Sequence, residues 1–591
     1  MKHMHPLSPW MSAARALVLA AFVSLLPSPA TAQLQVIEAD HLEMRYPHPF
    51  LDYLAPYSAR CFENSLRVHR RLWGFELSGP VHVMLDDLGD FSNASVWAGP
   101  RLNMNVHIAP ANFVYETGPS NERMNFTMNH ELVHVYALDG QAGADRTFRG
   151  LFRGIVREDA EHPETMLYGN LTLPRRASPR WYHEGIAVFL ETWMAGGLGR
   201  AQGPYDEMVF RAMVRDHSHF YDPLGLESEG TKVDFQVGTN SYLYGTRFMT
   251  YLAYQYSPEK VMDWVARRDG SKRTFSGQFR QVFGKSLDEG WADWIRFEHA
   301  FQESNLVAVR RYPTTGYRDL SSIALGSVSR AFVDSTSHSL IAAVFRPGVV
   351  AHLASIPLDG GAPAVLHEIP GPALYVVSSM AFDPDARRVY YTTDNNEWRD
   401  LCVYDLATHR GQRLIRDARI GDLAWDRVHH ELWGVRHLNG YSTIVRLAAP
   451  YTDWRQVVTL PYGLDACNLD IAPDGHTLAA SFSEINGHQS LRVLDTQRLA
   501  AADTSARTIW EFGSAIPEGF VFTPDGHALI GSSYYTGVSN IFRYDLARDS
   551  MEVLSNAETG FFRPVPTHDD SLIVFRYSGE GFTPARIDPR P

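Results

Sequence analysis

Residues 471–478 read Ile-Ala-Pro-Asp-Gly-His-Thr-Leu, and residues 521–529 read Val-Phe-Thr-Pro-Asp-Gly-His-Ala-Leu. In both stretches an apolar segment ends at Pro-Asp-Gly and a second apolar segment follows. Proline presets the φ angle that a turn needs and glycine accepts a positive φ, so Pro-Asp-Gly favours a tight turn. Apolar segments on either side of such a turn form neighbouring antiparallel strands. The two stretches therefore predict a fold built from repeated β units.

Weaker copies of this unit recur at intervals of about 40 to 50 residues, a spacing typical of propeller blades. Clear copies lie at residues 381–391 and 423–433, and fainter ones at 332–341 and 565–574. The copies predict an all-β propeller of about six blades over residues 311–591. Because the first and last copies lack Pro-Asp-Gly, the blade number stays open and the closing blade could be split.

The Pro-Asp-Gly units resemble the blades of the TolB-type propeller family, over roughly residues 320–591. This resemblance implies that the C-terminal part of the chain is a compact ring of antiparallel sheets. A ring of this kind could carry a protein partner or narrow the access to a neighbouring cleft.

The part of the chain before the repeats has a different pattern. Residues 33–120 predict a β-rich lobe, with strands at 80–85 and 102–108 and one helix over 57–72. Residues 121–310 predict a helical lobe, because apolar residues recur there at a spacing of three to four. The helices are expected over residues 124–138, 179–194, 243–256, 258–267 and 287–303, the last of them opened by a capping box at Ser286 and Glu289.

The helical lobe contains the motif His130-Glu131-Leu-Val-His134. On a helix, His130 and His134 lie one turn apart on the same face, so both imidazoles can reach a single zinc ion. Glu131 lies beside that face and can take a proton from a zinc-bound water. The motif predicts one Zn²⁺ per chain, and a catalytic zinc then needs a third protein ligand.

A second helix is expected to begin at Ser178-Pro179, since serine is a good N-cap and proline a good first helical residue. Its early turns contain Trp181-Tyr-His-Glu184-Gly-Ile-Ala187, and a carboxylate there can complete a His-His-Glu site. Together the two segments resemble the gluzincin clan of metallopeptidases, in its peptidase-MA-like branch. This resemblance implies that Glu184 is the third zinc ligand and that the fold is α+β and zincin-like.

The stretch that begins at Tyr242-Leu-Tyr244-Gly resembles the helix that follows the ligand helix in these peptidases. The resemblance implies that a tyrosine here donates a hydrogen bond to the reaction's oxyanion, and we favour Tyr244 over Tyr242. Both tyrosines could instead belong to the core. Asp139 and Glu191 are two candidates for orienting the histidine ligands, unless they are solvated acids.

The N-terminus predicts export. Residues 1–32 combine a basic start, an apolar core of about 11 residues and a small-residue end, which is typical of a cleaved secretory signal and too short for a membrane span. The mature chain is expected to be periplasmic or secreted, without stable insertion in a membrane. A net charge of −13 argues against nucleic-acid partners. Of the three cysteines, Cys402 and Cys467 could pair, but buried free thiols are the favoured interpretation.

The sequence thus predicts a multidomain, exported zinc metallopeptidase that hydrolyses peptide bonds in a peptide or protein substrate. Two alternatives stay open. A zinc hydrolase could act on an ester or a cell-wall cross-link, because the metal chemistry does not select the carbonyl. Alternatively, the propeller could be the working part of a periplasmic binding or scaffolding protein whose metal domain is inert.

Overall fold

The structure, a computed structural model, describes residues 34–90, 92–109, 122–194, 203–236, 238–370, 379–395, 398–567 and 571–590. The predicted signal at residues 1–32 lies outside this set. None of the helices in the described ranges combines the length and the apolar character that a membrane span requires.

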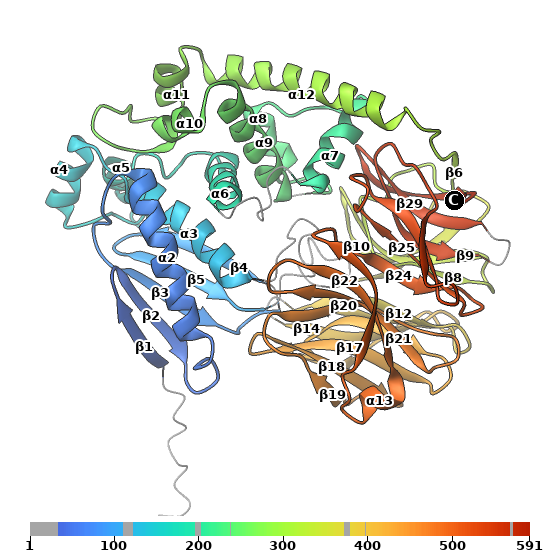
Figure 1. Cartoon of the computed structure of the whole chain (residues 1–591). Helices are drawn as coiled ribbons and strands as arrows, with labels where there is room; N and C mark the ends of the chain where they lie inside the picture. The colour runs from blue at the N-terminus through green and yellow to red at the C-terminus, as the bar shows by residue number, and fades with distance from the viewer. Residues whose placement is uncertain are drawn as a thin grey trace, which may run out of the picture.

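A mixed sheet opens the described chain, with five strands among the described residues in the order β1-β2-β3-β5-β4 (Figure 1). The parallel strands β2, β3 and β5 form its centre, and the antiparallel strands β1 and β4 form its edges. The crossover between β2 and β3 is the helix α2 (Ala55–Trp73), as a parallel connection requires. The strands are β1 (Leu34–Ala39), β2 (Leu42–Pro47), β3 (Val81–Asp86), β4 (Asn93–Ala98) and β5 (Leu102–His107). The strands and the helix predicted here are confirmed.

Helices dominate the next part of the chain and cover the sheet and one side of the propeller (Figure 1). They are α3 (Arg123–Asp139), α4 (Gly143–Phe152), α5 (Glu164–Thr172), α6 (Arg180–Met194), α7 (Pro204–Arg215), α8 (Pro223–Gly225), the π-helix η1 (Leu226–Gly230), α9 (Thr239–Gln255), α10 (Pro258–Val265), α11 (Phe275–Phe283) and α12 (Leu287–Val309). All five predicted helices are present, and α9 begins four residues earlier than expected. The capping box of α12 is formed, since Ser286 and Glu289 each accept from the other's backbone N–H.

The C-terminal part is a β-propeller with six blades in the described part of the chain. Blade 1 contains β7 (Ser327–Val328), β8 (Phe332–Asp334), β9 (Ser339–Arg346), β10 (Val349–Pro357) and β11 (Ala364–Glu368). Blade 2 contains β12 (Met380–Asp383), β13 (Arg388–Asp394), β14 (Arg399–Asp405) and β15 (Arg410–Ile415). Blade 3 contains β16 (Ile420–Asp426), β17 (Glu431–Leu438), β18 (Tyr441–Ala448) and β19 (Arg455–Thr459). Each repeat found in the sequence is the turn between the first two main strands of a blade.

Blade 4 contains β20 (Leu464–Ile471), β21 (Thr477–Glu484), β22 (Gln489–Asp495) and β23 (Ala506–Gly513), with the short helix α13 (Thr496–Ala500) between its last two strands. Blade 5 contains β24 (Glu518–Phe522), β25 (Ala528–Ser533), β26 (Asn540–Asp545) and β27 (Ser550–Val553). Blade 6 contains β28 (Phe561–Pro566), β29 (Leu572–Ser578), β30 (Gly581–Ile587) and β6 (Tyr317–Asp319). The last blade therefore takes its outer strand from the chain that precedes blade 1, and this split blade closes the ring.

The propeller contacts the first residue of α3. Arg123, the first residue of this helix, donates from Nη2 to the carbonyl oxygen of Gly440 at 2.6 Å, and its Nη1 lies 3.5 Å from Asp465 Oδ2. The Arg123 and Asp465 side chains are both 2% exposed. Beside them, the ring of Tyr53 stacks on Tyr441 with centroids 4.7 Å apart. The helix that carries the metal motif is thus anchored in the propeller at its N-terminus.

Two further contacts join the halves of the molecule. Arg419 of the propeller pairs with Asp87 and Asp90, which follow β3, at 2.8 and 2.7 Å. On α7, Arg211 donates to the carbonyl oxygens of Glu558 and Thr559 at 2.8 and 3.2 Å. Because Asp90 and Arg211 are buried, these contacts hold the two halves in a fixed relation.

The three cysteines are free and buried, so the favoured interpretation of Cys402 and Cys467 is confirmed. Burial raises the pKa of the Cys402 thiol to about 11, mainly because the thiolate would lose its hydration. Cys402 lies on β14 of blade 2 and Cys467 on β20 of blade 4. Both side chains behave as small apolar core residues.

Candidate metal centre

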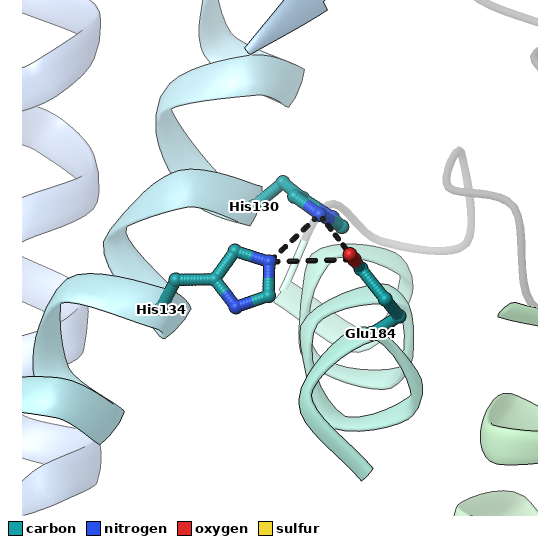
Figure 2. Close-up of side chains that lie close together, drawn as sticks. All are labelled: His130, His134 and Glu184. Carbon is teal, nitrogen blue, oxygen red and sulfur yellow. Dashed lines mark hydrogen bonds and ion pairs between the residues drawn. The ribbon is translucent and has the colours of Figure 1, made fainter. Parts of the chain in front are cut away.

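His130 and His134 project from one face of α3, and both imidazoles point toward α6 (Figure 2). The N-terminus of this helix is capped, because the Glu122 side chain accepts a hydrogen bond from the Asn125 backbone N–H at 2.7 Å. The spacing of four residues places the rings one turn apart, with centroids 4.9 Å apart. The Nε2 atoms of the two histidines lie 3.2 Å from each other.

Glu184 brings the third atom of the cluster from α6. This helix begins at Arg180, directly after the Ser178-Pro179 pair, so the expected start is confirmed. Glu184 Oε2 lies 3.4 Å from His130 Nε2 and 3.4 Å from His134 Nε2. The three atoms form a nearly equilateral triangle between two helices (Figure 2).

The size of this triangle fits a tetrahedral metal site. Metal bonds of 2.0–2.1 Å at tetrahedral angles place two ligand atoms about 3.3 Å apart. The sides of the triangle, at 3.2, 3.4 and 3.4 Å, match this spacing. Two imidazoles and one carboxylate are also a donor set that zinc accepts in catalytic sites. His130, His134 and Glu184 can therefore hold one zinc ion and leave a fourth position for water or substrate.

The charge of Glu184 suits this role. Burial alone would raise the pKa of its carboxyl, but hydrogen bonds and positive charge from His130 and His134 outweigh burial and hold the pKa well below its ordinary value. Arg180 lies one turn earlier on α6, with its Nε 3.6 Å from Glu184 Oε1. Glu184 is thus a carboxylate at neutral pH, ready to bind a cation.

Glu191 supports His130 from behind. Its Oε2 lies 2.6 Å from His130 Nδ1, and the Glu191 side chain is fully buried. A carboxylate in this position fixes the ring orientation of a metal-bound histidine and leaves Nε2 facing the metal. Asp139, the other candidate, accepts instead from Ser78 and pairs with Arg149 at the end of α3. Of the two acids, Glu191 is the one that contacts a cluster histidine.

The cluster opens into a cavity of about 860 Å³. The described residues that line it come from β4, α3, the segment before α6, and the starts of α6 and α9. Glu131 is one of them and is 5% exposed, which places the acid of the motif at the wall beside His130. The edge strand β4 contributes its whole length, from Asn93 to Ala98.

The two predicted tyrosines have different places. Tyr242 lines the cavity, where its ring stacks near His130 with centroids 6.4 Å apart and its hydroxyl lies 3.4 Å from Arg180 Nη2. Tyr244 is 1% exposed and lies in an aromatic core, stacked on Trp291, with its hydroxyl 3.7 Å from Met213 Sδ. The structure thus brings Tyr242 to the cluster and leaves Tyr244 outside the cavity, contrary to our preference.

Three basic residues at the cavity were not predicted from the sequence. Arg157 and Arg176 come from the stretch between α4 and α6, and His183 directly precedes Glu184 on α6. Burial and the neighbouring His134 lower the pKa of His183 to about 4, so its ring is neutral. His183 lines the cavity without joining the metal-ligand cluster.

No protein-family model and no curated protein sequence matches this chain. Among solved structures, the chain is similar to TolB from Acinetobacter baumannii, with 13% identity, 50% of this chain and 70% of that chain covered, and a TM-score of 0.31. For the putative TolB from Agrobacterium tumefaciens the identity is 10%, the match covers 33% of this chain and 68% of that chain, and the TM-score is 0.28. For the β-propeller domain of the Trilobed protease from Pyrococcus furiosus the identity is 9%, the match covers 45% of this chain and 94% of that chain, and the TM-score is 0.32. The six-bladed assignment itself rests on the hydrogen-bonded sheets of this chain.

Proposed function

We propose that this protein is an exported zinc metallopeptidase of the gluzincin type, with an α+β zincin-like unit joined to the propeller. The observation that carries the proposal is the triangle of His130, His134 and Glu184 atoms, which has the size of a tetrahedral zinc face. The adjacent Glu131 supplies an acid at the wall of the same cavity. A purely structural zinc site would normally have four protein ligands and no such glutamate.

Zinc in this site would supply Lewis acidity, which lowers the pKa of water to about 7 and polarises a carbonyl group. Glu131 accepts a proton from the attacking water as the C–O bond forms, and delivers it to the amine as the C–N bond breaks. Tyr242 donates a hydrogen bond from its hydroxyl group to the oxyanion, a role that its place in the cavity supports. Glu191 acts through His130 as a positioning residue.

A peptide is the substrate that the cavity walls favour. β4 lies at the edge of the sheet and pairs with β5, so its other side faces the cavity. An extended peptide can add to such an edge as a further strand, held by backbone hydrogen bonds. Esters and sugar chains lack the regular N–H and C=O groups that this mode of binding uses.

The predicted signal at residues 1–32 supports a periplasmic or secreted location for the mature enzyme in this proposal. Its partners in this proposal are a peptide or protein substrate and, on the propeller, a possible protein ligand. The net charge of −13 disfavours nucleic acid.

The test is digestion of a mixed peptide library by the zinc-loaded mature protein, with cleavage sites determined by mass spectrometry and zinc measured by elemental analysis. We expect the wild type to cut, and Glu131→Gln to keep one zinc per chain while its rate falls about a thousandfold. Glu303→Gln, an exposed acid on α12, is the matched control and should cut normally.

If the wild type binds one zinc and cuts no peptide, the peptidase proposal fails. Ester and cell-wall substrates would then test the non-peptidase hydrolase. Loss of all hydrolysis with a retained protein ligand on the propeller would favour the binding or scaffolding function.

A further inference from the structure

Arginines dominate the charge of the cavity. Four line it, at positions 123, 157, 176 and 180, against two acidic residues, Glu131 and Glu184. Both acids belong to the metal centre, where a divalent cation would offset their charge. The chain as a whole is acidic, with a net charge of −13, so the positive cavity is a local departure from the rest of the molecule. A cavity with one sign of charge concentrates ligands of the other sign.

Two of the four arginines are engaged with the protein itself. Arg123 holds Gly440 and Asp465 of the propeller. Arg180 lies 3.6 Å from Glu184 Oε1 and packs over the ring of Tyr242, with 5.5 Å between its guanidinium carbon and the ring centroid. These two side chains therefore already have partners within the protein.

Arg157 and Arg176 are available to a ligand. Arg157 is exposed and makes no ion pair or hydrogen bond with the described residues. Arg176 is 35% exposed; its Nη2 lies 3.9 Å from Glu158 Oε2, and its buried Nη1 has no hydrogen-bond partner among the described residues. Because Nη1 is covered, an anion in the cavity would meet the exposed part of the Arg176 side chain, beside Glu158.

Arg157 lies at one end of the edge strand, and Arg176 reaches the residue that follows Arg157, since Arg176 Nη2 lies 3.9 Å from Glu158 Oε2. Arg157 lies against Gly99, just after β4, since a Cβ atom added to Gly99 would be 3.3 Å from Arg157 Cβ. Arg176 comes from the segment that leads into α6, four residues before Arg180. A peptide laid along β4 would therefore bring one of its ends or side chains to this pair.

We propose that Arg157 and Arg176 form a carboxylate-binding subsite, so that the enzyme selects peptides with an acidic side chain or a free terminal carboxylate. Guanidinium groups bind carboxylates through paired charge-assisted hydrogen bonds, which gives them selectivity over uncharged amides. The inference rests on the proposed peptidase function, because it assumes that a peptide lies along β4.

The experiment measures binding apart from cleavage. Zinc-loaded Glu131→Gln protein is immobilised and exposed to random octapeptides in four pools, which contain or lack Asp and Glu and end in a carboxylate or an amide. Retained peptides are counted by mass spectrometry. We expect about a tenfold enrichment of carboxylate-bearing pools. The pool that is enriched distinguishes an acidic side chain from a terminal carboxylate.

Adding Arg157→Gln and Arg176→Gln to this protein should abolish the enrichment, whereas Arg157→Lys with Arg176→Lys should keep part of it because the charges remain. Arg101→Gln, an exposed arginine on the β4–β5 turn outside the cavity, is the matched control and should change nothing. Thermal unfolding and zinc content verify that each variant is folded.

Equal retention of all four pools, or an enrichment that survives in the double glutamine variant, would overturn the subsite. Enrichment without any cleavage by the wild type would instead leave the subsite standing and remove the peptidase function.

Discussion

Gly185 and Gly245 lie against each other where α6 crosses α9. A Cβ atom added to Gly185 would be 2.5 Å from the carbonyl carbon of Gly245, so no side chain fits between the two backbones. Gly185 follows Glu184 on α6, and Gly245 lies three residues after Tyr242 on α9. The two glycines therefore set the distance between the helix that holds the third candidate ligand and the helix that brings Tyr242 to the cavity.

The first prediction concerns this crossing. Gly245→Ala should lower the free energy of unfolding by about 3 kcal/mol and weaken zinc binding, because the helices must separate to accept the methyl group. Urea unfolding and zinc titration measure the two effects. Gly150→Ala on α4 is the control, since no atom lies within 4 Å of an added Cβ there and alanine favours a helix. Equal behaviour of the two variants would refute the prediction.

The second prediction separates the two acids near α3. Glu191→Gln should lower zinc affinity roughly 10- to 100-fold, because His130 loses the carboxylate at its Nδ1. Asp139→Asn should lower stability and leave zinc affinity unchanged, because Asp139 contacts Ser78 and Arg149. Competition with a chelator of known affinity measures both. A zinc affinity that responds to Asp139 and not to Glu191 would reverse the assignment.

The third prediction separates the two tyrosines. Tyr242→Phe should lower kcat roughly a hundredfold with zinc affinity unchanged, because it removes the hydroxyl that supports the oxyanion. Tyr244→Phe should leave kcat unchanged, since its hydroxyl lies by Met213 in the core. The measurement is steady-state kinetics on any peptide that the wild type cuts. A loss of kcat in Tyr244→Phe at normal stability would restore our original preference.

The fourth prediction tests the anchor of α3 in the propeller. Arg123→Met leaves Asp465 buried without its cation, which should cost about 3 to 5 kcal/mol of stability. Adding Asp465→Asn should recover part of this loss, because the uncompensated charge is removed. Tyr53→Phe, which keeps its ring stacked on Tyr441, serves as a mild comparison at the same contact. If calorimetry finds Arg123→Met as stable as the wild type, the contact between Arg123 and Asp465 does not stabilise the protein.

The fifth prediction concerns pH. Burial raises the pKa of Asp206 on α7 to about 7 from its usual 3.8; Arg247 opposes this rise, and Glu207 and Glu298 add to it. Between about pH 4 and pH 7 the folded state thus retains a proton that the unfolded state has lost, so stability falls as pH rises through this window. Asp206→Asn should flatten this slope and exceed the wild type in stability at pH 8.

Urea unfolding at pH 5 and pH 8 measures this effect, with Glu303→Gln as an exposed control on α12. An unchanged difference in stability between the two pH values in Asp206→Asn would exclude Asp206 as the cause.

Local patterns predicted most of the fold. The Pro-Asp-Gly turns located the first hairpin of blades 4 and 5, and weaker copies of the same unit located it in the other blades, because turn chemistry is set within a few residues. The closing strand β6 was missed, since Tyr317–Asp319 is short, exposed and lacks an alternating pattern. Its pairing with β30 is a contact between distant parts of the chain, and no local signal records it. The helices α4, α5, α7 and α11 were also not predicted. Much of the surface of α4 and α5 is exposed, so few of their residues belong to an apolar face.

The candidate site divides in the same way. The spacing of His130 and His134 fixes their geometry within one helix, so the sequence alone placed them together. Tyr242 and Tyr244 are two residues apart on α9 and point to opposite faces, and the crossing at Gly185 and Gly245 decides which face meets the cavity. That crossing is tertiary packing, which a single sequence does not display.

The split blade has a consequence for biosynthesis. The ring closes only when β30 meets β6, and β30 leaves the ribosome after every other strand in the described part of the chain. The candidate ligands on α3 and α6 are made long before that moment, as is Gly440, which anchors α3 from the turn between β17 and β18 in blade 3. A long-range contact of this kind is slow to form and is a late step in folding. A chain cut short before β30 would thus contain every candidate metal ligand and the blade that anchors α3, but no closed ring.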